Sequence, residues 1–271
     1  LIMRLLLRII IVYLMQKNNN LIKVITGLRR SGKSYLLNKL YKSYLLEQGV
    51  LDSQIITIAF DNLEDVMKLD RYLPNEQTII SDSKKNYLVN SRKFTLYISD
   101  LTKDDREYYL LLDEIQLLDN FVFALNGLLN HDNFDIYVTG SNSKMLSKDV
   151  ITEFRGRGDQ IHVYPLSFKE YYESSNLSFE DAYLDYQYYG GMPYLINLNG
   201  EERKQEYLKQ LFSEIYIKDI TERNGIKDIE SFEKLLCVLS SSIGSYTNPT
   251  NLEKTFKSVE NIVYGHVAIK N

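Results

Sequence analysis

The feature that most constrains the fold of this chain is segment 21–37. There a short apolar run leads into Gly27-x-x-x-x-Gly32-Lys33-Ser34. The apolar run predicts a buried strand, and the leucines and tyrosine of residues 36–45 recur at helical spacing. A glycine-rich turn between a strand and a helix is the P-loop pattern in its required context. The plainer alternative is a tight turn followed by a serine that caps the helix.

This pattern suits phosphate binding. Because glycine lacks a Cβ atom, the backbone at Gly27 and Gly32 can curve closely around an anion. Successive N–H groups and the N-terminal end of the helix then supply positive charge. Lys33 is expected to reach the β- and γ-phosphates, and the Ser34 hydroxyl to ligate Mg²⁺. The predicted nucleotide-binding residues are Gly27, Leu28, Arg29, Arg30, Ser31, Gly32, Lys33, Ser34 and Tyr35.

Two residues of this loop carry an unusual charge. Arg29 and Arg30 either contact phosphate, contact an acidic neighbour or face water, and the sequence leaves these alternatives open.

A second apolar run, residues 108–112, ends in Asp113-Glu114. An apolar strand followed by two carboxylates downstream of a P-loop is the Walker B arrangement. Asp113 is expected to hold Mg²⁺ through water, and Glu114 to orient and polarise an attacking water. The two carboxylates together favour hydrolysis of ATP over binding alone. Acidic residues also follow buried strands for purely structural reasons.

Polar residues end the next predicted strand, at Thr139, Ser141 and Asn142. Asn142 is our candidate for a hydrogen bond to the γ-phosphate or the attacking water, although Ser141-Asn-Ser143 would also serve as a helix N-cap. Further along, Arg155 and Arg157 lie between glycines. Either one acts as an arginine finger, with Arg157 our candidate, or both lie in a solvated loop.

Strand patterns alternate with helical patterns up to Pro165, which predicts an α/β fold with a parallel sheet and helices on both faces. Residues 61–90 read as polar and mostly helical. After Pro165 helical patterns dominate, interrupted at Gly190-Gly-Met-Pro193. We expect an N-terminal segment (1–20), a P-loop domain (21–165) and a smaller helical region (166–271).

Composition limits the number of domains, the charged partners and the cellular compartment that we expect. The chain has 271 residues, 44% hydrophobic and 25% charged, which suits one or two globular domains. A net charge of −4 gives no global field that would attract nucleic acid. Cys237 is the single cysteine, so we expect no internal disulfide and a cytoplasmic location.

The apolar N-terminal stretch is open to two readings. The run from Ile9 to Met15 is too short to span a bilayer. We therefore expect a helix that packs beside the nucleotide domain and no membrane partner. The alternative is a signal peptide, although no small-residue cleavage site follows the run.

Several motifs together resemble a known family. Gly27-Leu-Arg-Arg-Ser-Gly-Lys-Ser34, Leu112-Asp-Glu-Ile-Gln116, Val138-Thr-Gly-Ser-Asn-Ser143 and Tyr164-Pro-Leu-Ser-Phe168 occur in the order found in the prokaryotic AAA-type ATPases with a C-terminal DUF4143 region. Tyr189-Gly-Gly-Met-Pro193 resembles that second region. The resemblance covers most of the chain, although members usually continue beyond this C-terminus. We therefore expect the DUF4143-like region to be incomplete.

The resemblance implies an AAA (ASCE-type) P-loop ATPase with ATP and Mg²⁺ as ligands. It also implies that Arg157 acts in trans from a neighbouring subunit, in a homo-oligomer or with another protein partner. Three alternatives stay open. The first alternative is a nucleotide-binding regulatory or DNA-associated module with little hydrolysis. The second is a small P-loop kinase, and the third is an inactive remnant. The acidic net charge gives DNA binding little support.

Overall fold

The protein is described from a computed structural model. The described residues are 20–81, 87–140, 154, 156–217, 220–221, 225–226, 228–241, 243–244, 246, 248, 250–251 and 254. The chain divides into two compact units between Gln205 and Glu206. The expected N-terminal segment lies outside the described residues apart from Asn20, and the expected division after residue 165 stays a prediction.

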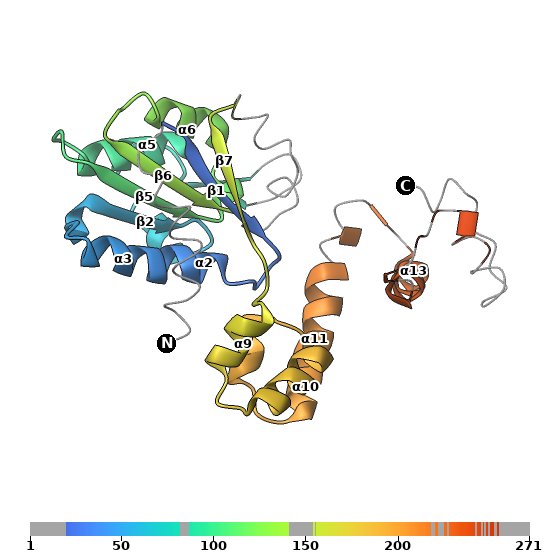
Figure 1. Cartoon of the computed structure of the whole chain (residues 1–271). Coiled ribbons are helices and arrows are strands. Elements are labelled where there is room, and N and C mark those ends of the chain that lie inside the picture. Colours follow the sequence, from blue (N-terminus) through green and yellow to red (C-terminus); the bar gives the residue numbers. More distant parts are fainter. Residues whose placement is uncertain are drawn as a thin grey trace. The chain divides into compact units, whose positions relative to one another are not determined.

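The first unit is built on a parallel five-stranded sheet (Figure 1). The strand order is β2-β5-β6-β1-β7, and every neighbouring pair runs parallel. All residues of β1, β5 and β6 are buried, as expected for parallel strands covered on both faces. The strands are β1 (Ile22–Gly27), β2 (Ile55–Ala59), β5 (Tyr108–Asp113), β6 (Phe134–Thr139) and β7 (Gly158–Val163).

Helices cover both faces of this sheet, which confirms the predicted α/β class (Figure 1). One face carries the helical segment that follows the P-loop, formed by α2 (Lys33–Tyr35), the π-helix η1 (Leu36–Tyr41) and α3 (Lys42–Glu47). The other face carries α5 (Ser91–Leu101) and α6 (Phe121–Leu128). The order in which the helices follow the strands is that of a doubly wound P-loop domain.

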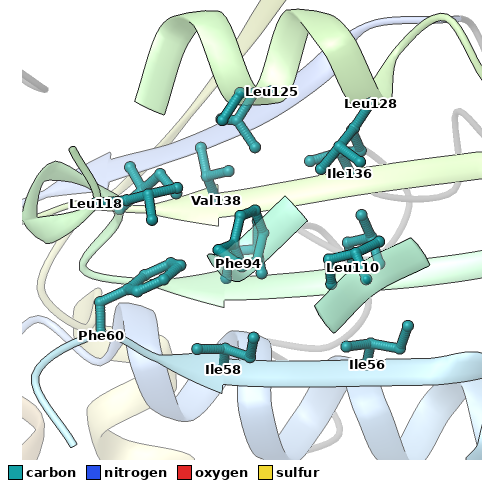
Figure 2. Close-up of a cluster of buried hydrophobic side chains, with 14 of the residues drawn as sticks. Ile56, Ile58, Phe60, Phe94, Leu110, Leu118, Leu125, Leu128, Ile136 and Val138 are labelled. Atoms are coloured by element: carbon teal, nitrogen blue, oxygen red, sulfur yellow. The ribbon is translucent and has the colours of Figure 1, made fainter. Parts of the chain in front are cut away.

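Two buried hydrophobic clusters follow from the alternation of side chains along the strands. On β5, Leu110 and Leu112 pack on the α5–α6 side, whereas Leu111 packs on the side of the P-loop helix. Figure 2 shows the first cluster, in which Leu125, Leu128 and Phe94 lie over side chains of β2, β5 and β6. The residues facing α5 and α6 include Ile56, Ile58, Leu110, Ile136 and Val138.

The region between β2 and β5 differs from the helical prediction for residues 61–90. Within residues 61–90, the described part forms one short helix, α4 (Leu63–Met67), and an antiparallel pair of three-residue strands, β3 (Ile79–Ser81) and β4 (Tyr87–Val89). Strands this short carry too few residues for their alternation to stand out from a polar segment. The pair is joined to the main domain because Val89 bridges Leu118.

A fully buried polar network links two central strands to the P-loop helix. The Lys23 ammonium on β1 donates to the Asp135 carboxylate on β6 at 2.5 Å. The Tyr137 hydroxyl donates to the same carboxylate at 2.9 Å, and the Tyr41 hydroxyl on η1 donates to Tyr137 at 2.6 Å. Burial raises the pKa of both tyrosines far above the ordinary value, so both remain protonated donors. This network pins η1 to the sheet.

The sequence after β7 is helical, as predicted. A capping box at Ser167 starts α9, and the Ser178 side chain caps α10. Among the described residues, no helix has the length and apolar character needed to cross a membrane. The remaining elements are η2 (Asp52–Gln54), η3 (Ile115–Leu117), α9 (Phe168–Ser174), α10 (Phe179–Tyr189), η4 (Pro193–Asn197), α11 (Glu201–Gln210), η5 (Leu211–Ile217) and α13 (Ile229–Ser241).

Candidate nucleotide-binding site

Three groups of predicted site residues meet at one edge of the sheet. The P-loop follows β1, Asp113 ends β5 and Thr139 ends β6. These three strands are neighbours in the order β5-β6-β1, so their carboxyl ends lie side by side although up to 112 residues separate them in sequence. Ligands of open α/β sheets bind at this edge.

The loop between β1 and α2 needs both of its glycines. A Cβ atom on Gly27 would lie 2.2 Å from the carbonyl oxygen of Val163 on β7, and the φ angle of Gly27 is +145°. Gly32 has a φ angle of +99°, in the region that side chains disfavour. Arg30 also adopts a left-handed conformation, with φ of 62°. The curved loop backbone therefore requires glycine at positions 27 and 32, where a side chain would clash or be strained.

Lys33 lies inside this curve. Its ammonium donates to the carbonyl oxygens of Gly27 at 3.0 Å and Leu28 at 2.9 Å, and only 4% of the residue is exposed. Burial lowers the pKa of Lys33, while the nearby carboxylates of Glu114 and Asp113 raise it. The loop thus holds a buried cation whose charge faces the two carboxylates at the strand ends.

Asp113 is held by three donors. The Ser34 hydroxyl donates to Oδ1 at 3.0 Å, Thr139 donates to the same oxygen, and the Asn38 amide donates to Oδ2 at 3.3 Å. Burial raises the pKa of Asp113 above its ordinary value, and the hydrogen bonds from Thr139 and Ser34 oppose that rise. Ser34 and Asp113, the two predicted metal ligands, are therefore in direct contact.

Glu114 follows in a left-handed conformation, with φ of 54° and ψ of 47°. Its N–H donates to the Thr139 hydroxyl at 3.2 Å, and its carboxylate accepts a hydrogen bond from the Gln116 amide. A left-handed backbone is uncommon for a residue with a long side chain and often occurs at functional sites. The turn places Glu114 next to Asp113 and within the electrostatic reach of Lys33.

The chemistry of these residues fits a nucleotide phosphate and a magnesium ion. The Ser31 hydroxyl is buried in the loop and has no hydrogen-bond partner among the described residues. A phosphate oxygen would accept a hydrogen bond from it, and from the third N–H of Lys33. Ser34 and Asp113 offer the hard oxygen ligands that Mg²⁺ prefers.

The remaining predicted site residues do not join Lys33, Ser34, Asp113 and Glu114 in this cluster, or they lie outside the described residues. Leu28, Arg29 and Tyr35 lie on the surface of the loop and helix start. Asn142 and Arg155 lie outside the described residues, so their predicted roles stay predictions. Arg157 is exposed, and its carbonyl oxygen accepts a hydrogen bond from the Ile22 N–H, at the start of β1.

The position of Arg157 decides how it can act. Ile22 begins β1 and Gly27 ends it, so Arg157 lies at the edge of the sheet opposite the P-loop. Six strand residues at about 3.3 Å each separate the two edges by roughly 15–20 Å. The backbone of Arg157 thus lies far from the site of its own chain, and its predicted catalytic role in trans stays a prediction.

Three site residues had no predicted role. Asn38 and Gln116 bond the two carboxylates, and Pro193 lies 3.9 Å from the position of a Cβ on Gly32. A polar residue four positions after Ser34, among buried leucines, was the available signal for Asn38. Gln116 and Pro193 stand in two of the motifs that carry the family resemblance, but no role followed from those motifs.

Comparison with protein families gives two matches. Residues 19–172 match the family model AAA_14, described as an AAA domain. Residues 180–264 match DUF8612, a domain of unknown function. The region that we expected to resemble DUF4143 therefore matches a different model.

Two curated relatives align along most of the chain. An uncharacterized protein of Haemophilus influenzae is 31% identical over 248 residues, which are 89% of this chain and 56% of the relative. An uncharacterized protein of Methanocaldococcus jannaschii is 30% identical over 251 residues, which are 87% of this chain and 49% of the relative. The chain spans about half the length of these relatives.

Comparison with solved structures gives matches that include DnaA and ORC2. AMPPCP-bound DnaA from Aquifex aeolicus has a TM-score of 0.42 at 15% identity, covering 98% of this chain and 85% of that one. Aeropyrum pernix ORC2 has a TM-score of 0.41 at 13% identity, covering 99% of this chain and 82% of that one. Because both scores are low, the assignment of the fold rests on the sheet topology.

Proposed function

Because this chain belongs to the AAA_14 family of AAA domains, we propose that it binds Mg²⁺–ATP at the edge formed by β5, β6 and β1 and hydrolyses it to ADP and phosphate. The observation that carries the proposal is the meeting of Lys33, Ser34, Asp113 and Glu114 at that edge. Hydrolysis would be coupled to a conformational change or to binding of a partner, in a cytoplasmic setting.

Each residue has a role that its position supports. The loop N–H groups and the Lys33 ammonium would bind the phosphates, while Ser34 and Asp113 would hold the metal ion. Bound Mg²⁺ would supply charge neutralisation on the β- and γ-phosphate oxygens. Glu114 accepts a proton from the attacking water as the new bond to the γ-phosphorus forms. The bond from that phosphorus to the β–γ bridging oxygen breaks, and ADP leaves.

The exposed Arg157 at the opposite edge leads to an expectation about assembly. We propose that Arg157 acts on the site of a neighbouring copy, as an arginine finger does in trans. The isolated chain should then hydrolyse ATP slowly, and phosphate release per chain should rise with protein concentration. Substitution of Arg157 by alanine should remove that rise without changing ATP affinity.

The first test is phosphate release from Mg²⁺–ATP by the wild type and Lys33→Ala. Release should vanish in Lys33→Ala, since the buried ammonium is the main phosphate contact. Lys39→Ala is the matched control, because Lys39 is an exposed lysine on the same helical segment. Equal release by Lys33→Ala and the wild type would overturn the proposal. ATP binding without turnover in the wild type would favour a nucleotide-binding regulatory module.

A further inference from the structure

Asn38 occupies a position that its neighbours do not explain. It lies in the π-helix η1, where Leu36, Leu37 and Leu40 pack into the hydrophobic cluster on the sheet. A π-helical turn inserted in an α-helix is rare and is often found at functional sites. Asn38 follows Ser34 by four residues, and both side chains reach the carboxylate of Asp113. One helical segment therefore contacts both oxygens of the predicted metal-binding carboxylate.

The two ends of the Asn38 amide have different surroundings. The nitrogen donates to Asp113 Oδ2 at 3.3 Å. Only the nitrogen can face a carboxylate, because two acceptors would repel each other, so the orientation of the amide follows from this contact. The oxygen, Oδ1, is buried and has no hydrogen-bond partner among the described residues. Buried acceptors without a partner are rare in folded proteins and call for an explanation.

We propose that Asn38 is a further residue of the metal site, whose amide oxygen accepts a hydrogen bond from water bound to Mg²⁺ while its nitrogen holds Asp113. This inference rests on the proposed function. Mg²⁺ usually keeps several water ligands and takes only one or two protein carboxylates. Those waters are strong donors that need acceptors close to the carboxylate. Asn38 Oδ1 is a buried acceptor one hydrogen bond away from Asp113.

The test compares ADP affinity in the presence of Mg²⁺ and of EDTA, measured by isothermal titration calorimetry on the full chain. Residues that support a metal ligand typically contribute 10–100-fold to metal affinity. Asn38→Leu should therefore reduce the Mg²⁺-dependent gain in ADP affinity by about tenfold or more, while affinity in EDTA stays unchanged. Asn38→Asp should keep or increase that gain, because an acceptor oxygen remains at the position and bound Mg²⁺ offsets the repulsion between the new carboxylate and Asp113, which weakens the site only when the metal ion is absent.

Asn126→Leu is the matched control. Asn126 is a half-buried asparagine on α6 whose Oδ1 also lacks a partner among the described residues. It should leave both affinities unchanged, and thermal unfolding of every variant reports on folding. If Asn38→Leu fails to fold, Asn38→Asp decides the question.

Three outcomes would overturn the inference. They are an unchanged Mg²⁺-dependent gain in Asn38→Leu, an equal loss of affinity with and without Mg²⁺, and a loss of the gain in Asn38→Asp. Failure of the proposed function is distinguishable from these, because the wild type would then show no ADP binding or no effect of Mg²⁺.

Discussion

Two buried polar networks share strands β1 and β6 and the helical segment after the P-loop, and they differ in completeness. In the network of Lys23, Asp135, Tyr137 and Tyr41, each side-chain polar atom has a partner. A fully bonded network of this kind fixes the packing of the elements that it joins. We call it the closed network.

The network at the carboxyl ends of the strands, centred on Asp113, is incomplete. It leaves Ser31 Oγ, Asn38 Oδ1 and Gln116 Oε1 buried and without partners within the described part of the chain. We call it the open network. Three of the six buried side-chain polar atoms that lack a partner among the described residues lie at this edge, where the proposed nucleotide and metal ion would complete their bonding. The comparison thus contrasts a complete structural network with an incomplete one at the proposed site.

The largest expected effect comes from changing Glu114, the proposed catalytic carboxylate of the open network. Glu114→Gln keeps the side-chain shape but cannot accept a proton from water. Phosphate release should fall by about 10²–10⁴-fold, the usual contribution of a general base. ATP affinity and thermal stability should match the wild type. Full turnover by Glu114→Gln would show that another group acts as the base.

Breaking the closed network should change stability instead of function. Lys23→Met leaves the Asp135 carboxylate buried without its cation, which should lower the free energy of unfolding by about 3–5 kcal/mol in urea denaturation. ATP affinity of the folded variant should be unchanged. The double variant Lys23→Met/Asp135→Leu is the control, and it should recover most of that loss because neither charge remains. A loss of ATP affinity without a loss of stability would contradict the comparison.

A smaller effect is expected where the open network orients Glu114. Gln116→Leu removes the amide that donates to the Glu114 carboxylate. Misplacement of a catalytic group by about 1 Å costs up to about 10²-fold in rate, so kcat should fall by about 10–100-fold with little change in KM. Steady-state kinetics would measure both constants. A rise in KM as large as the fall in kcat would instead indicate that Gln116 acts mainly through packing.

The smallest effect is expected from removing a single hydrogen bond of the closed network. Tyr41→Phe removes one hydroxyl that donates to Tyr137. The free energy of unfolding should fall by about 0.5–1.5 kcal/mol, the ordinary net contribution of a hydrogen bond. Phosphate release should stay at the wild-type rate. If the rate fell while the unfolding free energy did not, the closed network would be linked to the site.

The sequence alone predicted the strands that form β1, β5 and β6 and the P-loop helix, because long apolar runs and a spaced motif are strong local signals. It did not predict the β3–β4 pair, since three-residue strands show little alternation. It also did not reveal the partner of Lys23, which lies 112 residues away on β6. Pairing over such a distance depends on the order of strands in the sheet, which no local pattern encodes.

The site shows the same limit. Lys33, Ser34 and Asp113 were predicted because their residue types occur at a diagnostic spacing. Asn38 and Gln116 were not, because their contribution comes from the direction of a π-helical turn and a left-handed turn. The opposite-edge position of Arg157 follows from the register of β1 with β7, which becomes known only once the sheet is described.

The strand order also has a consequence for biosynthesis. β1 leaves the ribosome before its two neighbours, β6 and β7, which end at Thr139 and Val163. At ordinary rates of translation this delay is on the order of ten seconds. During that time β1, with its apolar residues Ile22, Val24 and Ile25, has neither of its neighbouring strands to pair with. The proposed nucleotide site can therefore form only after β6 and β7 have emerged, and we expect ATP to stabilise the nascent chain only from that point on.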